Sequence, residues 1–275
     1  MEKVFYSIRT GKNKNTNGFQ LKEILVLFER LYAELISDGY FSENFGFHCV
    51  DQGFIAGNIK DVSFDIFVKL RKDGLWPIHN KCQFYVEDDL FDMIEYLFTT
   101  VSKPIHGYMH SWDDCGMHWE TFNKSDGESY FRTRINALLN LYVNKFELSQ
   151  DGEVLSKPDE GFETIFQADI PTFDKRVNKL ISAAISKFRR HGASLDDRRH
   201  AVTDLAGVLE NLRPKMKATL TKADERDLFD IANNFGIRHH NDKQKTGYDQ
   251  ALWLSWMFYF YLSTIHVVLR KLEKI

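Results

Sequence analysis

The sequence is poor in cysteine and in proline, with 3 and 5 of its 275 residues. The cysteines, Cys49, Cys82 and Cys115, are odd in number and far apart, which excludes a disulfide framework and indicates a reducing compartment. The scarcity of proline and the lack of a serine- and glycine-rich tract argue against long disordered linkers. The first residues, Met1 to Tyr6, lack the basic and then apolar pattern of a secretory signal. We therefore expect a cytoplasmic location.

Hydrophobic residues are plentiful. They make up 43% of the chain, and the 23 Phe and 11 Tyr supply bulky side chains for helix packing. The length favours two domains over one. Charge divides the chain in a similar way: residues 1–171 carry 17 basic and 27 acidic side chains, whereas residues 172–275 carry 19 and 12. The basic second half indicates contact with a polyanion, and the alternative is attraction between the two halves.

In the first half, apolar residues recur at helical spacing. The spacing predicts three helices, over Phe19–Ile36, Glu87–Val101 and Tyr130–Tyr142. Val62–Leu70 fits a strand or a short helix, and the period alone does not separate them. An Asp-Gly turn within Lys145–Leu155 predicts a small β-hairpin. We expect a mostly helical α+β domain over residues 1–157, with a regulatory or sensor role.

Residues 158–171 contain two prolines and Gly161 and are predicted to link the domains. Beyond them every long stretch has helical spacing. We expect four helices, over Phe173–Arg190, Arg199–Leu212, Lys222–Phe235 and from Tyr248 onward. Pro214 is expected to stop the second of them. The predicted fold class is therefore mainly α, with a C-terminal four-helix bundle over residues 172–275.

The longest apolar run, Ala251–Leu269, has about the length of a bilayer span, roughly 20 residues. It contains Ser255 and His266, and its aromatic residues are spread along it, whereas a spanning helix confines them to its ends. We expect a buried helix that also packs against a second copy, and no membrane partner. A membrane-tethered adaptor is the less favoured alternative.

Histidines gather in Ile105–His118. His106, His110, Cys115 and His118 could supply three nitrogens and one sulfur to zinc. Their spacing matches no common zinc motif, and aromatic residues intervene. Packing is the favoured interpretation, so no metal or other cofactor is expected, and metal binding by these four residues stays open.

The densest polar group is Arg238, His239, His240, Asn241 and Asp242. A permanently charged Arg can grip a phosphate through two parallel hydrogen bonds. A neutral His can take a proton from a ribose 2′-hydroxyl, and a charged His can protonate the leaving 5′-oxygen. These residue types could therefore cleave RNA without a metal. The alternative is a polar loop that caps two helix ends.

Basic residues also crowd residues 175–222, which hold twelve Lys and Arg against four acidic residues. This excess is enough for several phosphate contacts, and a solvated helical surface is the alternative. The candidates for RNA binding are Arg189, Arg190, Arg198, Arg199, Lys215 and Lys217.

The second half, about residues 172–275, resembles a HEPN domain. This is a compact bundle of mostly four helices found in bacterial abortive-infection and toxin proteins and in CRISPR-associated ribonucleases. The resemblance rests on the order of the helices, on Ala201–Arg213 as the second helix, and on Phe235–Asn241 before the aromatic last helix. Phe131–Tyr142 followed by Phe146–Glu153 is similar to the helix and hairpin of abortive-infection N-terminal domains.

The resemblance implies a metal-independent ribonuclease, or an RNA-binding toxin, of bacterial anti-phage defence. It would act as a homodimer around one shared cleft. Arg238 would hold the scissile phosphate, and His239 or His240 would act as general base and acid. Asn241 and Asp242 would orient them, and Glu210 could assist from the neighbouring helix.

Active members of the family carry an arginine, a polar residue, three to five further residues and then a histidine. Here positions 243–245 read Lys-Gln-Lys. Either His239 or His240 takes the role of that histidine, or the domain is an inactive HEPN-like dimer that binds a protein or a nucleotide.

Overall fold

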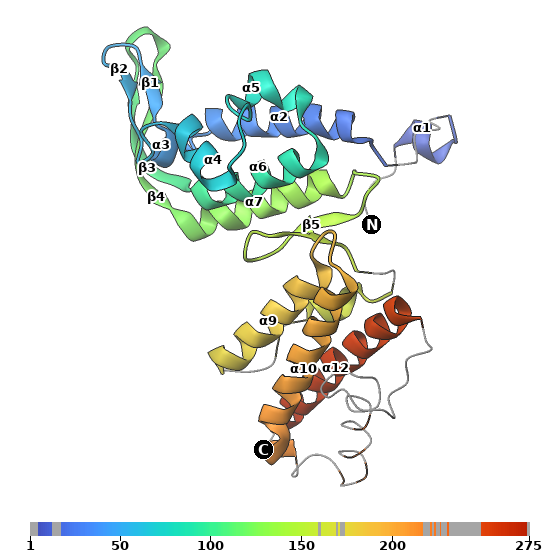
Figure 1. Cartoon of the computed structure of the whole chain (residues 1–275). Coiled ribbons are helices and arrows are strands. Elements are labelled where there is room, and N and C mark those ends of the chain that lie inside the picture. The colour runs from blue at the N-terminus through green and yellow to red at the C-terminus, as the bar shows by residue number, and fades with distance from the viewer. Residues whose placement is uncertain are drawn as a thin grey trace. The chain divides into compact units, whose positions relative to one another are not determined.

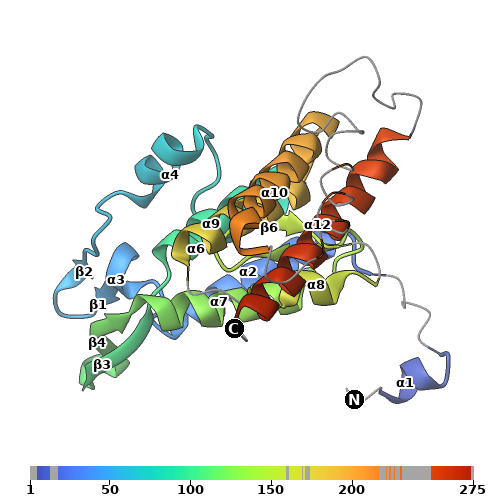
Figure 2. The same cartoon turned by 90° about the horizontal axis from the view of Figure 1, so that it is seen from below.

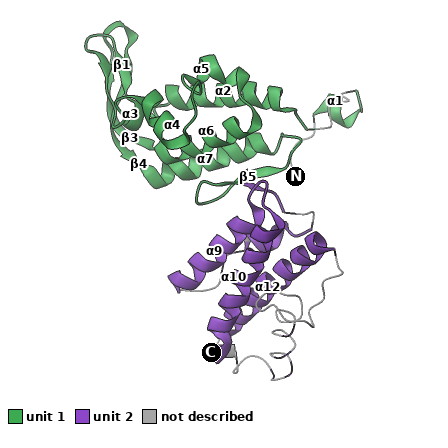
Figure 3. Ribbon diagram, viewed as in Figure 1, with its two compact units in different colours: residues 1–154 green, residues 155–275 purple. Residues whose placement is uncertain are grey.

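The computed structural model describes residues 5–12, 18–158, 161–168, 170, 174–216 and 249–273, and the single residues 221, 223, 226 and 230. The chain forms two compact units, Met1–Val154 and Leu155–Ile275, shown in green and purple in Figure 3. Each unit has its own core of buried apolar side chains.

Unit 1 is built mainly from helices (Figure 1). They are α1 (Tyr6–Arg9), α2 (Leu21–Ser37), α3 (Ser42–Phe45), α4 (Val62–Leu70), α5 (Ile78–Lys81), α6 (Glu87–Thr100) and α7 (Lys124–Leu139), with 3-10 turns η1 (Cys82–Phe84) and η2 (Trp112–Asp114). At the N-terminus of several of these helices, a nearby side chain accepts a hydrogen bond from a backbone N–H of the first turn. Asp61, for example, precedes α4, and its carboxylate accepts a hydrogen bond of 2.9 Å from the backbone N–H of Phe64.

Within the part of the chain that the structure describes, three two-stranded sheets accompany these helices. The strands are β1 (Phe47–Cys49), β2 (Gly53–Ile55), β3 (Lys103–His110), β4 (Gly116–Asn123), β5 (Phe146–Leu148) and β6 (Val154–Ser156). Each strand pairs with its neighbour in sequence, and β1–β2 and β3–β4 are antiparallel. These two hairpins lie side by side at one end of unit 1 in both views (Figures 1 and 2), although no ladder joins them within residues 18–158.

The core of unit 1 lies where α2, α6 and α7 face one another. Phe28 of α2, Ile94 of α6 and Ile135 of α7 are almost fully buried. At the edge of this core, the guanidinium of Arg134 donates two hydrogen bonds, of 2.7 and 2.9 Å, to the carboxylate of Glu34. This bidentate pair joins α7 to α2, and the two helices lie at opposite ends of the sequence of unit 1.

In its described residues, unit 2 contains the short α8 (Glu163–Gln167) and three long helices, α9 (Lys175–Arg189), α10 (Leu195–Met216) and α12 (Gln250–Leu272). Helix α10 packs against both α9 and α12. The apolar face of α9 meets the aromatic face of α12, where the rings of Phe188 and Phe258 stack with centroids 3.9 Å apart. Aromatic packing of this kind is what the composition predicts.

The predicted mainly α class is confirmed, and several bounds need correction. Val62–Leu70 is a helix, and α7 begins at Lys124, six residues before the predicted start. Pro214 does not stop α10, which runs on to Met216. A proline this close to a helix end removes one hydrogen bond of the final turn, and the apolar face of α10 outweighs that loss.

The boundary between the units falls within β6, before the predicted linker of residues 158–171. Part of that segment belongs to unit 2, because Ile165, Phe166 and Ile170 pack against its core. The predicted helix Lys222–Phe235 lies outside the described residues apart from single positions, so the four-helix count and the HEPN-like bundle stay predictions.

Candidate metal centre

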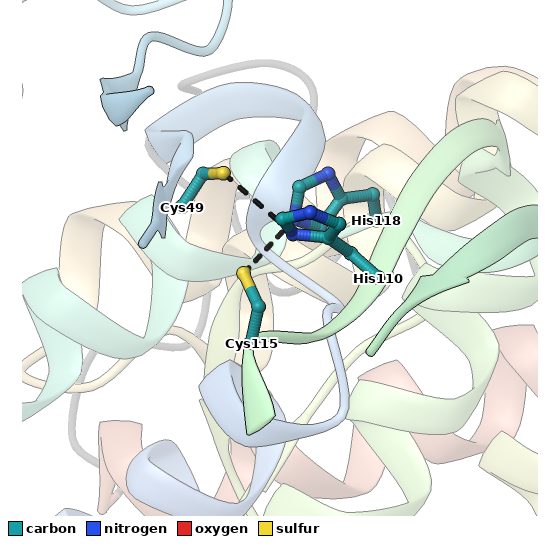
Figure 4. Close-up of side chains that lie close together, drawn as sticks. All are labelled: Cys49, His110, Cys115 and His118. Atoms are coloured by element: carbon teal, nitrogen blue, oxygen red, sulfur yellow. Dashed lines mark hydrogen bonds between the residues drawn. The ribbon is translucent and has the colours of Figure 1, made fainter. Parts of the chain in front are cut away.

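Two cysteines and two histidines of unit 1 converge at the two neighbouring hairpins (Figure 4). Cys49 ends β1, His110 ends β3, Cys115 lies in the turn before β4, and His118 is the third residue of β4. One sulfur or nitrogen atom from each residue lies within 4.8 Å of the corresponding atoms of the other three. Two strand ends, one turn and one position within β4 thus present two sulfurs and two imidazole nitrogens to one point.

The β3–β4 hairpin supplies three of the four side chains. Across its ladder Tyr108 pairs with His118 and His110 pairs with Gly116. Because alternate residues of a strand share a face, Tyr108, His110 and His118 project to the same side of the hairpin. Between the strands, η2 and the left-handed Asp113 (φ 48°) turn the chain so that Cys115 comes back over that face.

Cys49 reaches the cluster from the other hairpin, 61 positions before His110. It pairs with Gly53 at the end of the β1–β2 ladder, where Gly53 adopts a φ of 72° that suits glycine. The Cys49 side chain is fully buried, at 0% exposure. A fully buried thiol at this place has the imidazole of His110 as a polar neighbour, with Sγ 3.9 Å from Nδ1.

Each imidazole faces a sulfur with one nitrogen and an oxygen with the other. His110 has Nδ1 toward Cys49 and Nε2 3.1 Å from the carboxylate of Asp51. His118 has Nε2 3.2 Å from Sγ of Cys115 and Nδ1 3.2 Å from the hydroxyl of Tyr108. Histidines that bind metal commonly use their second nitrogen to hold such an oxygen partner, which fixes the tautomer and the ring orientation.

Aromatic rings enclose the cluster on part of its surface. The ring of His118 is 4% exposed and lies 4.8 Å from the ring of Phe47 and 4.9 Å from that of His110. Cys115 and His110 are half-buried, so one side of the cluster reaches solvent. This surface gives an ion a path of entry while the buried side keeps water away from the ligand atoms.

The ligand set is that of a zinc site. Two thiolates and two imidazoles suit Zn²⁺, which binds sulfur at about 2.3 Å and histidine nitrogen at about 2.0–2.1 Å in a tetrahedron. Those bond lengths place neighbouring ligand atoms about 3.3–3.8 Å apart. The observed sulfur–nitrogen distances of 3.2 and 3.9 Å bracket that range, and the ligand atoms all lie within 4.8 Å of one another, so side-chain adjustments of up to about 1 Å would complete the tetrahedron. Four protein ligands leave no open position for substrate, which is typical of structural zinc sites.

Three of these four residues belong to the group that the sequence offered as possible zinc ligands, although packing was the favoured interpretation. The structure places the fourth member of that group, His106, elsewhere: it is exposed and pairs with Thr121, four residues before His110 along β3. Four residues of strand span about 13 Å, which is too far for a shared ion. Cys49 was not among the residues that the sequence offered. It lies 61 positions before His110, so a search for closely spaced ligands does not find it.

The third cysteine, Cys82, takes no part in the cluster. Its thiol is buried and donates a hydrogen bond of 3.4 Å to the carbonyl oxygen of Leu25. Burial, together with the charge of Glu29, raises the pKa of Cys82 to about 12. Cys82 is therefore a packed core residue, as expected of a protonated thiol in apolar surroundings.

The residues predicted for RNA cleavage, Arg238, His239, His240, Asn241 and Asp242, lie outside the described residues, as does Lys217. Their predicted roles stay predictions. Glu210, predicted to assist them, is half-buried on α10.

Among the cations predicted to bind RNA, Arg189 has an interior position. It is 7% exposed, donates two hydrogen bonds, of 3.0 and 2.9 Å, to the carbonyl oxygen of Ser156, and lies over the ring of Phe166. A guanidinium held in this way has a structural role in unit 2 and does not face solvent.

The other predicted cations lie nearer the surface. Arg190 and Lys215 are exposed, whereas Arg198 and Arg199 are half-buried. Arg198 lies over the ring of Phe188, and Arg199 donates a hydrogen bond of 3.2 Å to Gln250 at the start of α12. Arg190 and Lys215 are therefore the best placed of the described candidates to meet a phosphate.

Comparison of the chain with protein-family models, with curated proteins and with solved structures gives no match. Among the described residues, α12 is a helix long and apolar enough to cross a membrane by length and composition. Of its most apolar 18-residue window, 56% is buried in the structure, and the core helix of a soluble protein passes the same test.

Proposed function

We propose that unit 1 is a zinc-binding module in which Cys49, His110, Cys115 and His118 hold one structural zinc ion. One observation carries the proposal: four side chains of the right kind bring one ligand atom each to within 4.8 Å of the others. The outer oxygen partners of both histidines, Asp51 and Tyr108, add support, because a metal site needs its imidazoles held in one tautomer.

The ion would act as a crosslink between two hairpins that belong to separate sheets. A bond through the metal joins Cys49 of one hairpin to three residues of the other, across 61 positions of sequence. Short two-stranded sheets are marginal by themselves, so such a link stabilises both. Because the binding free energy of a structural ion is also folding free energy, the hairpins should be ordered best in the zinc-bound protein.

A second chemistry for the same residues is less well supported. Cys115 and His118 alone could form a nucleophile and its base, since Sγ lies 3.2 Å from Nε2. That assignment leaves Cys49 and His110 without a role, although both point to the same place (Figure 4). Metal binding uses all four side chains and both outer partners.

Metal analysis of the full chain tests the proposal. We expect about one zinc per chain after purification without chelators, and loss of most of it in Cys49→Ser and in His118→Gln. His106→Gln is the matched control, because His106 lies on the same strand as His110 but away from the cluster. Zinc contents that are equal in all four proteins, or no zinc in the wild type after reconstitution, would contradict the proposal.

We also propose, as a second function, that unit 2 binds or cleaves RNA as a homodimer. Support comes from the sequence resemblance to HEPN domains, from the basic excess of residues 172–275, and from the exposed Arg190 and Lys215. The exposed Leu252, Trp253 and Trp256 on α12 offer an apolar surface for the predicted dimer.

RNA cleavage by the full chain in EDTA tests this second function. We expect cleavage that is lost in Arg238→Ala and in the double variant His239→Ala/His240→Ala, because the proposed chemistry needs no metal. Light scattering gives the oligomeric state in the same buffer. Intact RNA at high protein concentration, from a chain that binds RNA or a protein as a dimer, would favour the inactive HEPN-like alternative.

A further inference from the structure

The two sulfurs of the cluster come from different hairpins and lie no more than 4.8 Å apart. They also differ in accessibility: Cys49 is fully buried, whereas Cys115 is half-buried in the turn before β4. An oxidant that approaches from solvent therefore meets the sulfur of Cys115 first, and the buried sulfur of Cys49 lies within 4.8 Å of it. This is the arrangement in which an oxidised cysteine is captured by a second, resolving cysteine.

We propose that the zinc centre is a peroxide-releasable crosslink, in which oxidation replaces the zinc ion by a Cys49–Cys115 disulfide. This inference rests on the proposed zinc site. Zinc itself has no redox chemistry, so the electrons come from the two ligand sulfurs. The oxidant is hydrogen peroxide, whose O–O bond accepts two electrons.

The reaction has two steps. The Cys115 thiolate attacks one peroxide oxygen, the O–O bond breaks, and a sulfenic acid forms while the leaving hydroxide takes a proton from the acid form of the buffer and becomes water. The Cys49 thiolate then attacks the sulfur of the sulfenic acid, forms the S–S bond, and displaces a second hydroxide, which is protonated in turn. In sum, two thiolates, one peroxide and two protons give one disulfide and two waters, and Zn²⁺ leaves because only two imidazoles remain to bind it.

The geometry allows this exchange without unfolding. A disulfide needs the sulfurs at about 2.05 Å, so they must approach by less than 3 Å from their present separation. The turn before Cys115 is exposed at Asp113 and Asp114, which both have positive φ angles, so a shift of this turn would disturb little packing. The two hairpins remain joined in either state, first through zinc and then through sulfur.

The third cysteine, Cys82, should not react with peroxide. Its thiol is buried in the core, and burial raises its pKa to about 12, so it stays protonated and is a poor nucleophile toward peroxide. Oxidation should thus consume two of the three thiols of the chain. The unreacted Cys82 serves as an internal reference for thiol counting.

The test starts from the zinc-loaded full chain. After treatment with a small excess of hydrogen peroxide, a zinc-binding dye measures released metal, and peptide mass spectrometry locates disulfides. We expect release of about one zinc per chain, loss of two thiols, and one disulfide between Cys49 and Cys115. Reduction with dithiothreitol followed by added zinc should restore the loaded protein.

Two variants separate the steps. In Cys82→Ser the release should be unchanged, because that thiol takes no part. In Cys49→Ser, Cys115 should be trapped as a sulfenic acid by a dimedone-type reagent, with no disulfide. This second readout does not depend on tight zinc binding by the variant.

Three results overturn the inference: zinc retained under peroxide, zinc released with Cys115 oxidised to sulfinic acid and no disulfide, or a disulfide that involves Cys82. Failure of the zinc site itself is distinguishable, because the wild-type chain would then contain no zinc before peroxide is added.

Discussion

Asp51, in the turn of the β1–β2 hairpin, orients the ring of His110: its carboxylate oxygen lies 3.1 Å from Nε2 of the imidazole. The other nitrogen, Nδ1, therefore points into the cluster, toward Sγ of Cys49. Asp51 and Cys49 are two residues apart on one hairpin, so a single short segment supplies both a proposed ligand and the group that orients another ligand.

Replacing Asp51 by Asn should weaken zinc binding without unfolding unit 1. Loss of an outer carboxylate partner typically costs about 10–100-fold in metal affinity. Competition with a chelator of known affinity measures the change. Asp113→Asn is the control, because Asp113 is exposed and asparagine also tolerates the left-handed backbone of this turn. Equal affinities for Asp51→Asn and the wild type would remove Asp51 from the site.

Replacing Gly107 by Ala should disturb the hairpin that carries three of the ligands. An added Cβ would lie 2.2 Å from the carbonyl oxygen of His118 and 2.9 Å from Cα of Trp119, so the strands must separate. We expect a loss of about 1–3 kcal/mol in the free energy of unfolding, measured by urea titration, together with weaker zinc binding.

Met109→Ala, two positions further along β3, is the comparison for Gly107→Ala. Met109 is 63% exposed, and removing its side chain should change stability by less than about 0.5 kcal/mol. If Gly107→Ala is as stable as Met109→Ala, the close approach of the two strands at Gly107 is not as described.

Unit 2 should lose stability below neutral pH through His266. This side chain is 8% exposed on α12, and burial, followed by the charge of Arg270, lowers its pKa below the usual 6.5. The folded state therefore holds His266 neutral, while the unfolded chain binds a proton as pH falls through about 6.5. Stability is full above that pH and declines below it, until the lowered folded pKa is reached.

The comparison is His266→Met, which fills the same place with an apolar side chain and removes the titration. Urea unfolding between pH 7.5 and 5 should show a smaller loss of stability in the variant than in the wild type. Zinc release from unit 1 affects both proteins alike. Parallel pH curves would show that His266 does not contribute.

Arg189 and Arg190 are adjacent in sequence, but replacing one or the other should have different effects on the stability of unit 2. Arg189→Met removes two charge-assisted hydrogen bonds to Ser156, so we expect a loss of about 1.5–3 kcal/mol in the free energy of unfolding. Arg190 is exposed, and Arg190→Met should change stability by less than about 0.5 kcal/mol.

For RNA affinity we expect the reverse order: Arg190→Met should have the larger effect and Arg189→Met the smaller one. If unit 2 binds RNA, Arg190→Met should weaken binding and reduce its salt dependence, because an exposed cation can release a counterion on contact with phosphate. Weakened RNA binding in Arg189→Met, at unchanged stability, would show that Arg189 reaches RNA after all.

The helices could be predicted from the sequence because their apolar residues repeat locally. α2, α6 and α9 begin and end within two residues of the predicted positions. The β3–β4 hairpin was missed, since its glycine, histidine and aromatic residues follow no steady alternation and its ladder shifts register near His106. Without that hairpin, the four side chains of the His106–His118 segment could not be sorted into those that share a face and those that do not.

Cys49 shows the limit of reading a site from sequence. Its place in the cluster depends on the packing of two hairpins separated by several helices, and no local pattern carries that information. The available signal was a lone cysteine in a glycine-punctuated stretch, but three separate cysteines gave no reason to choose one. The Arg238–Asp242 motif differs from Cys49, because its five residues are consecutive and can be found in the sequence alone. Its chemistry stays a prediction.

X-ray absorption at the zinc edge of the full chain tests the central claim most directly. The proposed site predicts a first shell of two sulfurs at about 2.3 Å and two nitrogens at about 2.0–2.1 Å, with the sulfur contribution reduced in Cys49→Ser. A shell of nitrogen and oxygen alone, or one unchanged by Cys49→Ser, would contradict it.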